Sequence, residues 1–405
     1  MTRPLEGVRV LEVAIYAFVP SAAAILADWG AEVLKIEHPV LADPGRNTAA
    51  WGVPAVVNGV SHLWEVPNRG KRAMTLDLAT PEGKEILMRL VDESDVFLTN
   101  FLPAARRKLG IEPEDIRDRN PRIIYARGSA QGPKGELAER GGFDGVTYWT
   151  RTGASLGVTP PGAPAPLSMP GPGFGDLQCG MALAGGVSAA LYRRERTGEG
   201  TVVDVSLMSA GLWAMGMTIS GTSVLDVDRL THQSHENSTN PLVNEYRTRD
   251  GGFVAMGFLQ SDRYWPEFCL LVDRLDWLAD ERFADSAARA ENSQILVKFL
   301  DELFSERDQA EWEELLSRQD GQWDVVMPAG KVRCDAQAQA NGYVQLVQHE
   351  GGGKIVLVPA PAQFDGEAPQ LGKAPTFSAD TDDVLKSHGL DDDAIANLRV
   401  RGVIA

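Results

Sequence analysis

The N-terminal segment has the pattern of a β-α-β unit, and no other stretch of the chain restricts the fold as strongly. An apolar, β-branched run at 8–13 suits a buried parallel strand, a helical stretch occupies 21–29, and a second strand is predicted at 33–37. Pro20 marks the beginning of the helix and Gly30 its end. Strand, helix and strand in this order build a doubly wound sheet, so an α/β fold is predicted.

The alternation of strands and helices continues along the chain. Further strands are predicted at 76–78, 96–99, 123–126, 201–207 and 252–258, and helices at 81–91, 112–120 and 176–196, with a polar linker at 226–240. The tail has strand-like and helical pieces and is expected to pack back on the first domain. The sequence therefore predicts a large domain over 1–225, completed by 343–405, and a small α/β domain with linkers over 226–342.

Asp176 is the acidic residue that stands out. It follows a Pro/Gly-rich segment at 159–175, which cannot form regular structure, and it opens the predicted helix at 176–196. The positive end of a helix favours an ionised carboxylate, which could act as a nucleophile. The alternative is that Asp176 only caps the helix, because Asp is a preferred N-cap residue. The small residues that would allow close packing of this helix are Gly180, Gly185 and Gly186.

Composition excludes several classes of protein. The 405 residues suggest two or three folding units at roughly 150 residues each. A net charge of 39 − 56 = −17 argues against binding to nucleic acid or to an anionic membrane, although a local basic pocket could still hold a small anion. Three scattered cysteines, no apolar leader and no bilayer-length apolar stretch predict a cytoplasmic protein.

The common cofactor motifs are missing. Glu37 ends the second strand as a ribose-binding acid would, but the preceding loop at 14–20 lacks the glycines of a dinucleotide site. The chain has no phosphate-binding loop and no nucleophile elbow. His232 and His235 have a metal-like spacing, yet they lie in the polar linker, where a solvated loop is the expected structure. No metal and no permanently bound cofactor is predicted.

Several long segments, in order, resemble the class III CoA-transferases, a family that includes formyl-CoA and carnitine-CoA transferases and 2-methylacyl-CoA racemases. They are PLEGVRVLEVA, LADWGAEVLKIEHP, NRGKRAMTLDLATPEGKEILMRLV, SDVFLTNFLPAARRKLGI, NPRIIYARGSAQGPKG, GFGDLQCG, ALYRRERTGEGTVVDVSLMSA, YRTRDGGFVAMGF and GLDDDAIANLRVRGVI. The resemblance implies a Rossmann-like large domain built from both chain ends, a smaller α/β domain and an interlocked homodimer. It also implies that an acyl-CoA thioester and a carboxylic acid are the substrates.

The resemblance assigns roles to single residues. Asp176 matches the catalytic Asp, which attacks the acyl thioester and forms a mixed anhydride and then an aspartyl-CoA thioester. The positions that match CoA contacts are Tyr16, His38, Leu76, Asn100, Phe101, Lys108 and Arg140. His38 stands where many members have Arg, and Arg140 lies near a basic position without being in register with it. Phe143 and Gln260 are predicted to line the acyl pocket.

Two alternatives to a CoA-transferase remain open. A racemase on the same fold needs two acid/base groups on either side of the α-carbon. Phe143 replaces the His of the racemase branch, and Gln260 replaces its Glu, so this alternative is disfavoured. The other alternative is a CoA-binding protein without catalytic activity, against which Asp176 argues. The segment at 231–246 lacks the tetraglycine loop of formyl-CoA transferases, so an oxalate/formate pair is not supported.

Overall fold

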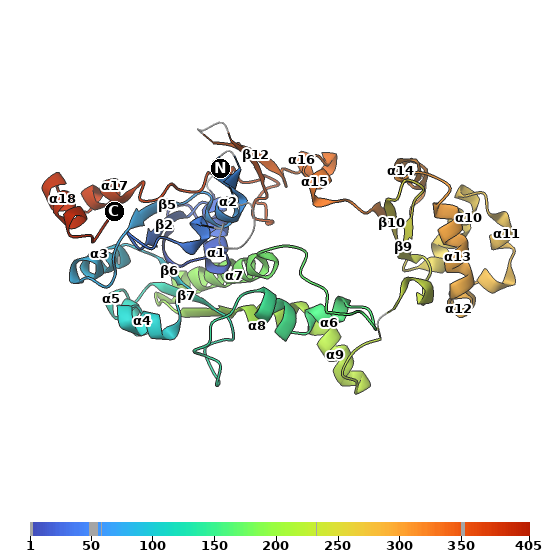
Figure 1. The fold of residues 1–405 in the computed structure, drawn as a ribbon, viewed down its shortest axis with the longest axis horizontal. Helices are drawn as coiled ribbons and strands as arrows, with labels where there is room; N and C mark the ends of the chain where they lie inside the picture. Colours follow the sequence, from blue (N-terminus) through green and yellow to red (C-terminus); the bar gives the residue numbers. More distant parts are fainter. Residues whose placement is uncertain (1–2, 48–55, 58, 232, 350–352) are drawn as a thin grey trace. The chain divides into compact units, whose positions relative to one another are not determined.

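The computed structural model describes residues 3–47, 56–57, 59–231, 233–349 and 353–405. They form two compact units (Figure 1). The first comprises Met1–Val158, Ala165–Asp228 and Asp335–Ala405, and the second comprises Thr159–Pro164 and Arg229–Cys334. The domain boundaries expected from the sequence stay a prediction, because two compact units need not fold independently. Within these described ranges, no helix has both the length and the apolar composition that a bilayer crossing requires.

A six-stranded parallel sheet forms the centre of the first unit. Its strands are β1 (Arg9–Val13), β2 (Glu32–Glu37), β5 (Arg72–Thr75), β6 (Val96–Thr99), β7 (Ile124–Ser129) and β8 (Val202–Ser206). They lie side by side in the order β5-β2-β1-β6-β7-β8. The chain therefore builds outward in one direction from β1 and in the opposite direction from β6. Crevices for ligands form where the direction reverses, at the carboxyl ends of the strands.

Helices cover both faces of this sheet. Those of the first unit are α1 (Phe18–Asp28), α2 (His62–Asn68), α3 (Pro81–Asp92), α4 (Pro103–Leu109), α5 (Pro113–Arg119), α6 (Ala154–Val158), α7 (Phe174–Thr197), α8 (Leu207–Ala214), α9 (Gly216–Leu225), α16 (Ala336–Ala340), α17 (Thr381–Ser387) and α18 (Asp392–Val400). Successive strand residues point to opposite faces, so Val10 joins the core under α1 and α7, while Leu11 joins the core under α3 and α5.

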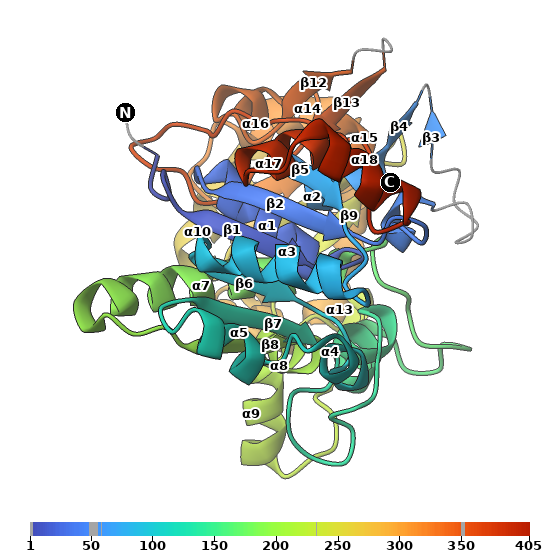
Figure 2. The same cartoon turned by 90° about the vertical axis from the view of Figure 1, so that its left-hand side faces the viewer.

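The C-terminal segment packs on the second of these faces. Val384 and Leu385 of α17 and Ile395 of α18 are buried in the same core as Leu11. The Thr75 amide donates to Thr381 Oγ1 at 3.1 Å, which fixes α17 beside the edge strand β5. Figure 2 shows these two C-terminal helices, in red, next to β5. Residues from both ends of the chain thus belong to the first unit.

Most elements predicted for the first unit are present, with shifts of a few residues at their ends. Thr80 caps α3, and its Oγ1 accepts from the Gly83 amide at 3.1 Å. The strand predicted at 76–78 is wrong, because the strand is β5, at Arg72–Thr75. Its sequence, RAMT, lacks the continuous apolar run that indicated the other strands, so only its pairing with β2 defines it.

The second unit has a three-stranded antiparallel sheet of order β11-β10-β9, which consists of β11 (Trp323–Val325), β10 (Phe253–Gly257) and β9 (Val243–Arg247). The strand predicted at 252–258 is therefore confirmed. The helices are α10 (Ser261–Leu271), α11 (Leu275–Leu278), α12 (Ser286–Glu291), α13 (Ser293–Phe304), α14 (Gln309–Leu316) and α15 (Ala329–Val332). Aromatic residues such as Trp265, Trp277 and Trp312 fill its core.

Two short hairpins belong to the first unit: β3 (Val56–Val57) with β4 (Val60–Ser61), and β12 (Gln345–Gln348) with β13 (Lys354–Leu357).

Candidate active site

Two loops meet where the strand order reverses, one after β1 and one after β6. The Asn100 side chain joins them: its Oδ1 accepts from the Ile15 amide at 3.0 Å, and its Nδ2 donates to the Ile15 carbonyl at 2.7 Å. Both hydrogen-bonding ends of the amide are therefore used by one backbone residue. Asn100 fixes the position of the loop at the carboxyl end of β1.

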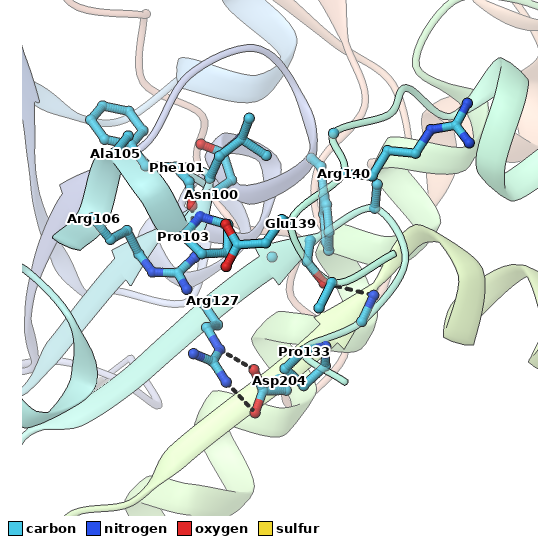
Figure 3. A pocket seen from close by; sticks show the side chains of 18 of the residues that line it. Asn100, Phe101, Pro103, Ala105, Arg106, Arg127, Pro133, Glu139, Arg140 and Asp204 are labelled. Atoms are coloured by element: carbon cyan, nitrogen blue, oxygen red, sulfur yellow. Dashed lines mark hydrogen bonds and ion pairs between the residues drawn. The ribbon is translucent and has the colours of Figure 1, made fainter. Parts of the chain in front are cut away.

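A cavity of about 1110 Å³ opens at this point, within the first unit. Its size is in the range of pockets that enclose a small-molecule ligand. The apolar part of the wall includes Phe18, Phe101, Leu102, Ala130, Phe143 and Leu207. The polar part includes Arg106, Arg107, Arg127, Glu139, Arg140 and Asp204. Figure 3 labels all of these except Arg107. Asp176 also lines the cavity.

Asp176 lies in the first turn of α7. The helix begins after Gly173, which occupies the N-cap position, so Asp176 is the third helical residue and does not cap the helix. Close packing of α7 on α1 sets its place: a Cβ built on Gly180 would lie 2.0 Å from Ser21 Oγ and 3.0 Å from the Ala22 amide nitrogen. Only glycine fits there. A Cβ on Gly185, by contrast, would meet nothing within 4 Å, so the predicted packing role of Gly185 is wrong.

A second carboxyl group, that of Asp144, lies against the same helical turn. Its Oδ2 accepts from the Gly175 amide at 3.2 Å, and its Oδ1 accepts from the Gly145 amide at 2.8 Å. The approach is close, because a Cβ on Gly175 would lie 2.9 Å from Asp144 Cβ and 2.7 Å from the Tyr148 ring. Asp144 is buried and belongs to a segment far from α7 in the sequence.

These surroundings change the protonation of Asp176. Burial, and then the neighbouring Asp144 carboxylate, raise the pKa of Asp176 to about 7. Near neutral pH the Asp176 carboxyl is therefore protonated more readily than its place at a helix N-terminus alone would predict. Loss of water and a like charge outweigh the helix dipole. Burial also raises the pKa of the Cys179 thiol, one turn further along α7, which keeps that thiol protonated.

Tyr16 and Phe143 form an aromatic pair at the cavity. Their rings meet edge to face, with centroids 5.4 Å apart. Phe143 is largely exposed, and Tyr16 has a left-handed backbone with φ of 64°. The Tyr16 amide donates to Asp43 Oδ1 at 3.0 Å.

Most arginines of the polar wall are already paired. Arg127 forms an ion pair with Asp204, as Figure 3 shows. Arg106 is buried, donates to the Phe101 carbonyl at 2.7 Å and contacts Glu112 Oε2 at 3.1 Å. Arg107 and Glu139 form an exposed pair at 2.9 Å. Any anionic ligand here would compete with carboxylates for these guanidinium groups.

The structure brings some of the predicted site residues together and leaves others elsewhere. Those that line the cavity are Tyr16, Asn100, Phe101, Arg140, Phe143 and Asp176. His38, Leu76 and Lys108 lie outside its wall. His38 Nδ1 accepts from the amides of Val40 and Leu41, at 3.1 and 3.2 Å.

Leu76 is buried in the core beside β5, and Lys108 is exposed on α4. Gln260 belongs to the second unit, where it precedes α10.

Sequence patterns gave no role to Asp144, Arg127 and Asp204. Asp144 directly follows Phe143 in the chain, and nothing in the sequence links it to Asp176. Arg127 and Asp204 lie on adjacent strands, which only the sheet order reveals.

His232 lies outside the described residues, while His235 contacts Asp301 Oδ1 at 2.9 Å. Among the residues that the structure describes, no cluster of three or more His, Cys, Asp or Glu could hold a metal ion.

Comparison with known proteins identifies relatives of the whole chain. Residues 5–381 match the model of CoA-transferase family III. The (R)-2-hydroxy-4-methylpentanoate CoA-transferase of Clostridioides difficile is 32% identical and covers 99% of each chain. The cinnamoyl-CoA:phenyllactate CoA-transferase of Clostridium sporogenes is 29% identical, over 98% of this chain and 96% of that protein.

A solved structure has the same fold. The CAIB/BAIF family protein from Brucella suis superposes with a TM-score of 0.82 at 25% sequence identity, over 96% of this chain and 100% of that one. The family match spans both units, and the site described above lies at the carboxyl ends of the parallel strands. The chain belongs to CoA-transferase family III and is a CoA-transferase.

Proposed function

We propose that Asp176 carries the acyl-CoA:carboxylate transfer as a covalent nucleophile. Its carboxylate would attack the thioester carbonyl of the acyl-CoA, form an acyl-aspartyl anhydride and release the CoA thiolate. The thiolate would attack the aspartyl carbonyl, which gives an aspartyl-CoA thioester and frees the donor acid. The acceptor carboxylate would then reverse both steps and leave as its CoA ester.

One observation carries this proposal: Asp176, in the first turn of α7, lines the cavity. A nucleophile with a pKa of about 7 is partly ionised at neutral pH and more basic than an ordinary carboxylate. A more basic carboxylate oxygen is a stronger nucleophile, provided that the carboxyl group is deprotonated. The helix N-terminus would stabilise negative charge near Asp176 during the attack.

Trapping of the intermediates tests the mechanism. Hydroxylamine added with a good acyl-CoA should attack the activated aspartyl carbonyl and leave a hydroxamate on Asp176, found by peptide mass spectrometry. Asp176→Ala should bind CoA but transfer nothing. Transfer by Asp176→Ala above background would refute the covalent mechanism.

The cavity supports part of the proposed CoA contacts. Tyr16, Phe101 and Arg140 lie on its wall, where they could contact CoA directly. Because both ends of the Asn100 amide are used by Ile15, Asn100 would act by holding the loop. Contacts of His38, Leu76 and Lys108 with CoA remain predictions, and so does a role of Gln260 in the acyl pocket. Single alanine variants with CoA titration would test each of them.

We propose an apolar 2-hydroxy acid as the acceptor. Two relatives are named for acceptors of this kind, and the wall of the cavity that Asp176 lines includes Phe18, Ala130, Phe143 and Leu207. A panel of carboxylates, read by mass spectrometry of the CoA esters, tests the assignment. 2-Hydroxy-4-methylpentanoate and phenyllactate should be preferred to succinate and glutarate, and the opposite order would contradict it.

A racemase remains the disfavoured alternative. Phe143 lines the cavity but has no proton to give, so a second acid/base group facing Asp176 across the α-carbon is lacking at that position. Incubation of a chiral 2-methylacyl-CoA in deuterated water should give no exchange at the α-carbon. Deuterium incorporation at a catalytic rate would move the protein to the racemase branch.

We also propose an interlocked homodimer with a Rossmann-like large domain. Helices α8 and α9 expose large apolar side chains: Trp213 is 88% exposed, Met217 94% and Val224 84%. Such a surface is typical of a protein interface. The strand order of the sheet supports the Rossmann-like assignment. A folded monomer in dilute sedimentation runs would refute the dimer, and cell fractionation would test the predicted cytoplasmic location.

A further inference from the structure

Tyr16 has a backbone conformation that an aromatic residue rarely adopts. Its φ of 64° lies in the left-handed region, where L-residues other than Asn and Asp are disfavoured. A residue stays in that region only where its surroundings hold it, and such positions cluster at functional sites. Here the conformation places the Tyr16 ring against Phe143 on the cavity wall.

The Asp43 side chain is hydrogen-bonded to the backbone of Tyr16. Its Oδ1 accepts from the Tyr16 amide at 3.0 Å and from the Gly45 amide at 2.8 Å. Its Oδ2 lies 2.8 Å from Lys35 Nζ. Asp43 is only 2% exposed, so its charge and hydrogen bonds are shielded from water. One carboxylate oxygen of Asp43 therefore accepts hydrogen bonds from backbone amides, and the other forms an ion pair with Lys35.

The ion pair belongs to a buried network beneath the loop. Lys35 Nζ also lies 2.8 Å from Glu12 Oε1 and donates to the Ala14 carbonyl at 2.8 Å. Glu12 Oε2 contacts Lys71 Nζ at 2.6 Å, and Lys71 donates to the Pro20 carbonyl at 2.9 Å. The network thus binds the loop at Ala14 and Tyr16, and the first turn of α1 at Pro20. It joins β1, β2 and the residue before β5 to the loop that lines the cavity.

Such a network is a poor way to gain stability. Charges removed from water lose hydration that their mutual attraction only partly restores, and apolar replacements are often as stable. Burial by itself would lower the pKa of Lys35, but Asp43, Glu12 and Glu37 outweigh it and raise the pKa, which keeps Lys35 charged. A fixed geometry is what buried charges of this kind can provide.

We infer that Asp43 is a positioning residue for substrate binding: it holds the Tyr16 amide so that the Tyr16 ring stands against Phe143 in the wall of the acyl-CoA cavity. The inference rests on the proposed function, since it takes this cavity as the place where the acyl-CoA binds. Lys35 and Glu12 support Asp43 from below. Asp43 itself touches neither the cavity nor Asp176.

A double-mutant cycle on Tyr16 and Asp43 tests whether Asp43 affects substrate binding through the Tyr16 ring. Asp43→Ala should raise the KM for the acyl-CoA about tenfold, as expected for loss of a hydrogen bond to a charged group, and should change kcat much less. Tyr16→Gly adopts the left-handed conformation without strain but removes the ring, so it should raise KM as well. In the Tyr16→Gly background, Asp43→Ala should raise KM no further, because Asp43 acts through the Tyr16 ring. Independent, multiplicative effects on KM would overturn the inference.

Asp43→Asn separates the hydrogen bond from the charge. The Asn amide oxygen can still accept from Tyr16 and Gly45, while its amide nitrogen faces Lys35. This variant should keep KM within about twofold of the wild type and lower the melting temperature, because Lys35 loses one of its two carboxylate partners and keeps only Glu12. If Asp43→Asn raises KM as much as Asp43→Ala does, substrate binding depends on the charge of Asp43 and not on its hydrogen bond with the Tyr16 amide. That result would overturn the inference.

Two further variants keep the test decisive. Should Asp43→Ala fail to fold, Asp43→Ala/Lys35→Met removes both members of the pair and leaves no unpaired buried charge between them. Asp176→Ala is the control for the proposed function. If Asp176→Ala still transfers CoA, the covalent mechanism fails, whereas the Tyr16–Asp43 cycle can still be measured as acyl-CoA affinity in that variant.

Discussion

The pH dependence of transfer should report the contact between Asp176 and Asp144. The covalent step needs an ionised Asp176, and its pKa is raised to about 7, first by burial and then by Asp144. Below that pH, kcat/KM should fall about tenfold per pH unit, because only the ionised fraction reacts. At about pH 5 roughly 1% of the protein would be ionised at Asp176.

Asp144→Asn removes the like charge and keeps the shape of the side chain. The charged or titratable groups that interact with Asp176 are Asp144 and the Cys179 thiol, and of these Asp144 raises its pKa. The acid limb of the kcat/KM profile should therefore move down by roughly one pH unit. It should stay above the range of an ordinary Asp, since burial, the larger cause, remains.

The variant also has a structural consequence that can be separated from the electrostatic one. An Asn at this position can accept from Gly145 or Gly175, but its amide nitrogen cannot accept from the other. Either Gly145 or the first turn of α7 would lose one hydrogen bond, worth about 1 kcal/mol of unfolding free energy. A displaced first turn would lower the plateau of the profile without moving its midpoint.

Rates of CoA-ester exchange, measured by chromatography between about pH 5 and about pH 8.5 at fixed ionic strength, would give the profile. Glu139→Gln is the matched control: it removes another carboxylate from the cavity wall, one that pairs with Arg107. Its acid limb should coincide with that of the wild type. An unmoved limb in Asp144→Asn, or a flat wild-type profile across this range, would refute the reasoning.

Three other predictions concern folding and assembly. Gly180→Ala should lower the free energy of unfolding by about 1–3 kcal/mol in denaturant titrations, because its Cβ would meet α1, whereas Gly185→Ala, with open space, should not. Asp176→Asn should melt above the wild type at about pH 8 and with it at about pH 4: a carboxyl whose folded pKa is raised contributes stability at low pH that is lost as the pH rises through 7. Met217→Asp should give monomers or aggregates in sedimentation, and an unchanged dimer would exclude α9 from the interface.

Much of the fold could be predicted because its patterns are local. The apolar runs of β1, β2, β6 and β7 and the Thr80 cap depend on residues near one another in the chain. Strand β5 was misplaced, because its four residues carry no apolar run and are defined by hydrogen bonds to β2. Gly185 was misjudged for a related reason: the spacing of glycines does not say which of them faces another helix.

The candidate site divides in the same way. By itself, the sequence determined the α/β class and the resemblance to CoA-transferases, and it singled out Asp176 as the candidate nucleophile, since each depends on patterns within continuous segments. Tertiary structure alone decided the raised pKa of Asp176, the hydrogen bond from the Tyr16 amide to Asp43 and the ion pair of Arg127 with Asp204. Each of these depends on burial or on a distance of a few ångströms between residues far apart in the chain. Hydration and Coulomb energies are set by such distances in space, and sequence separation does not encode them.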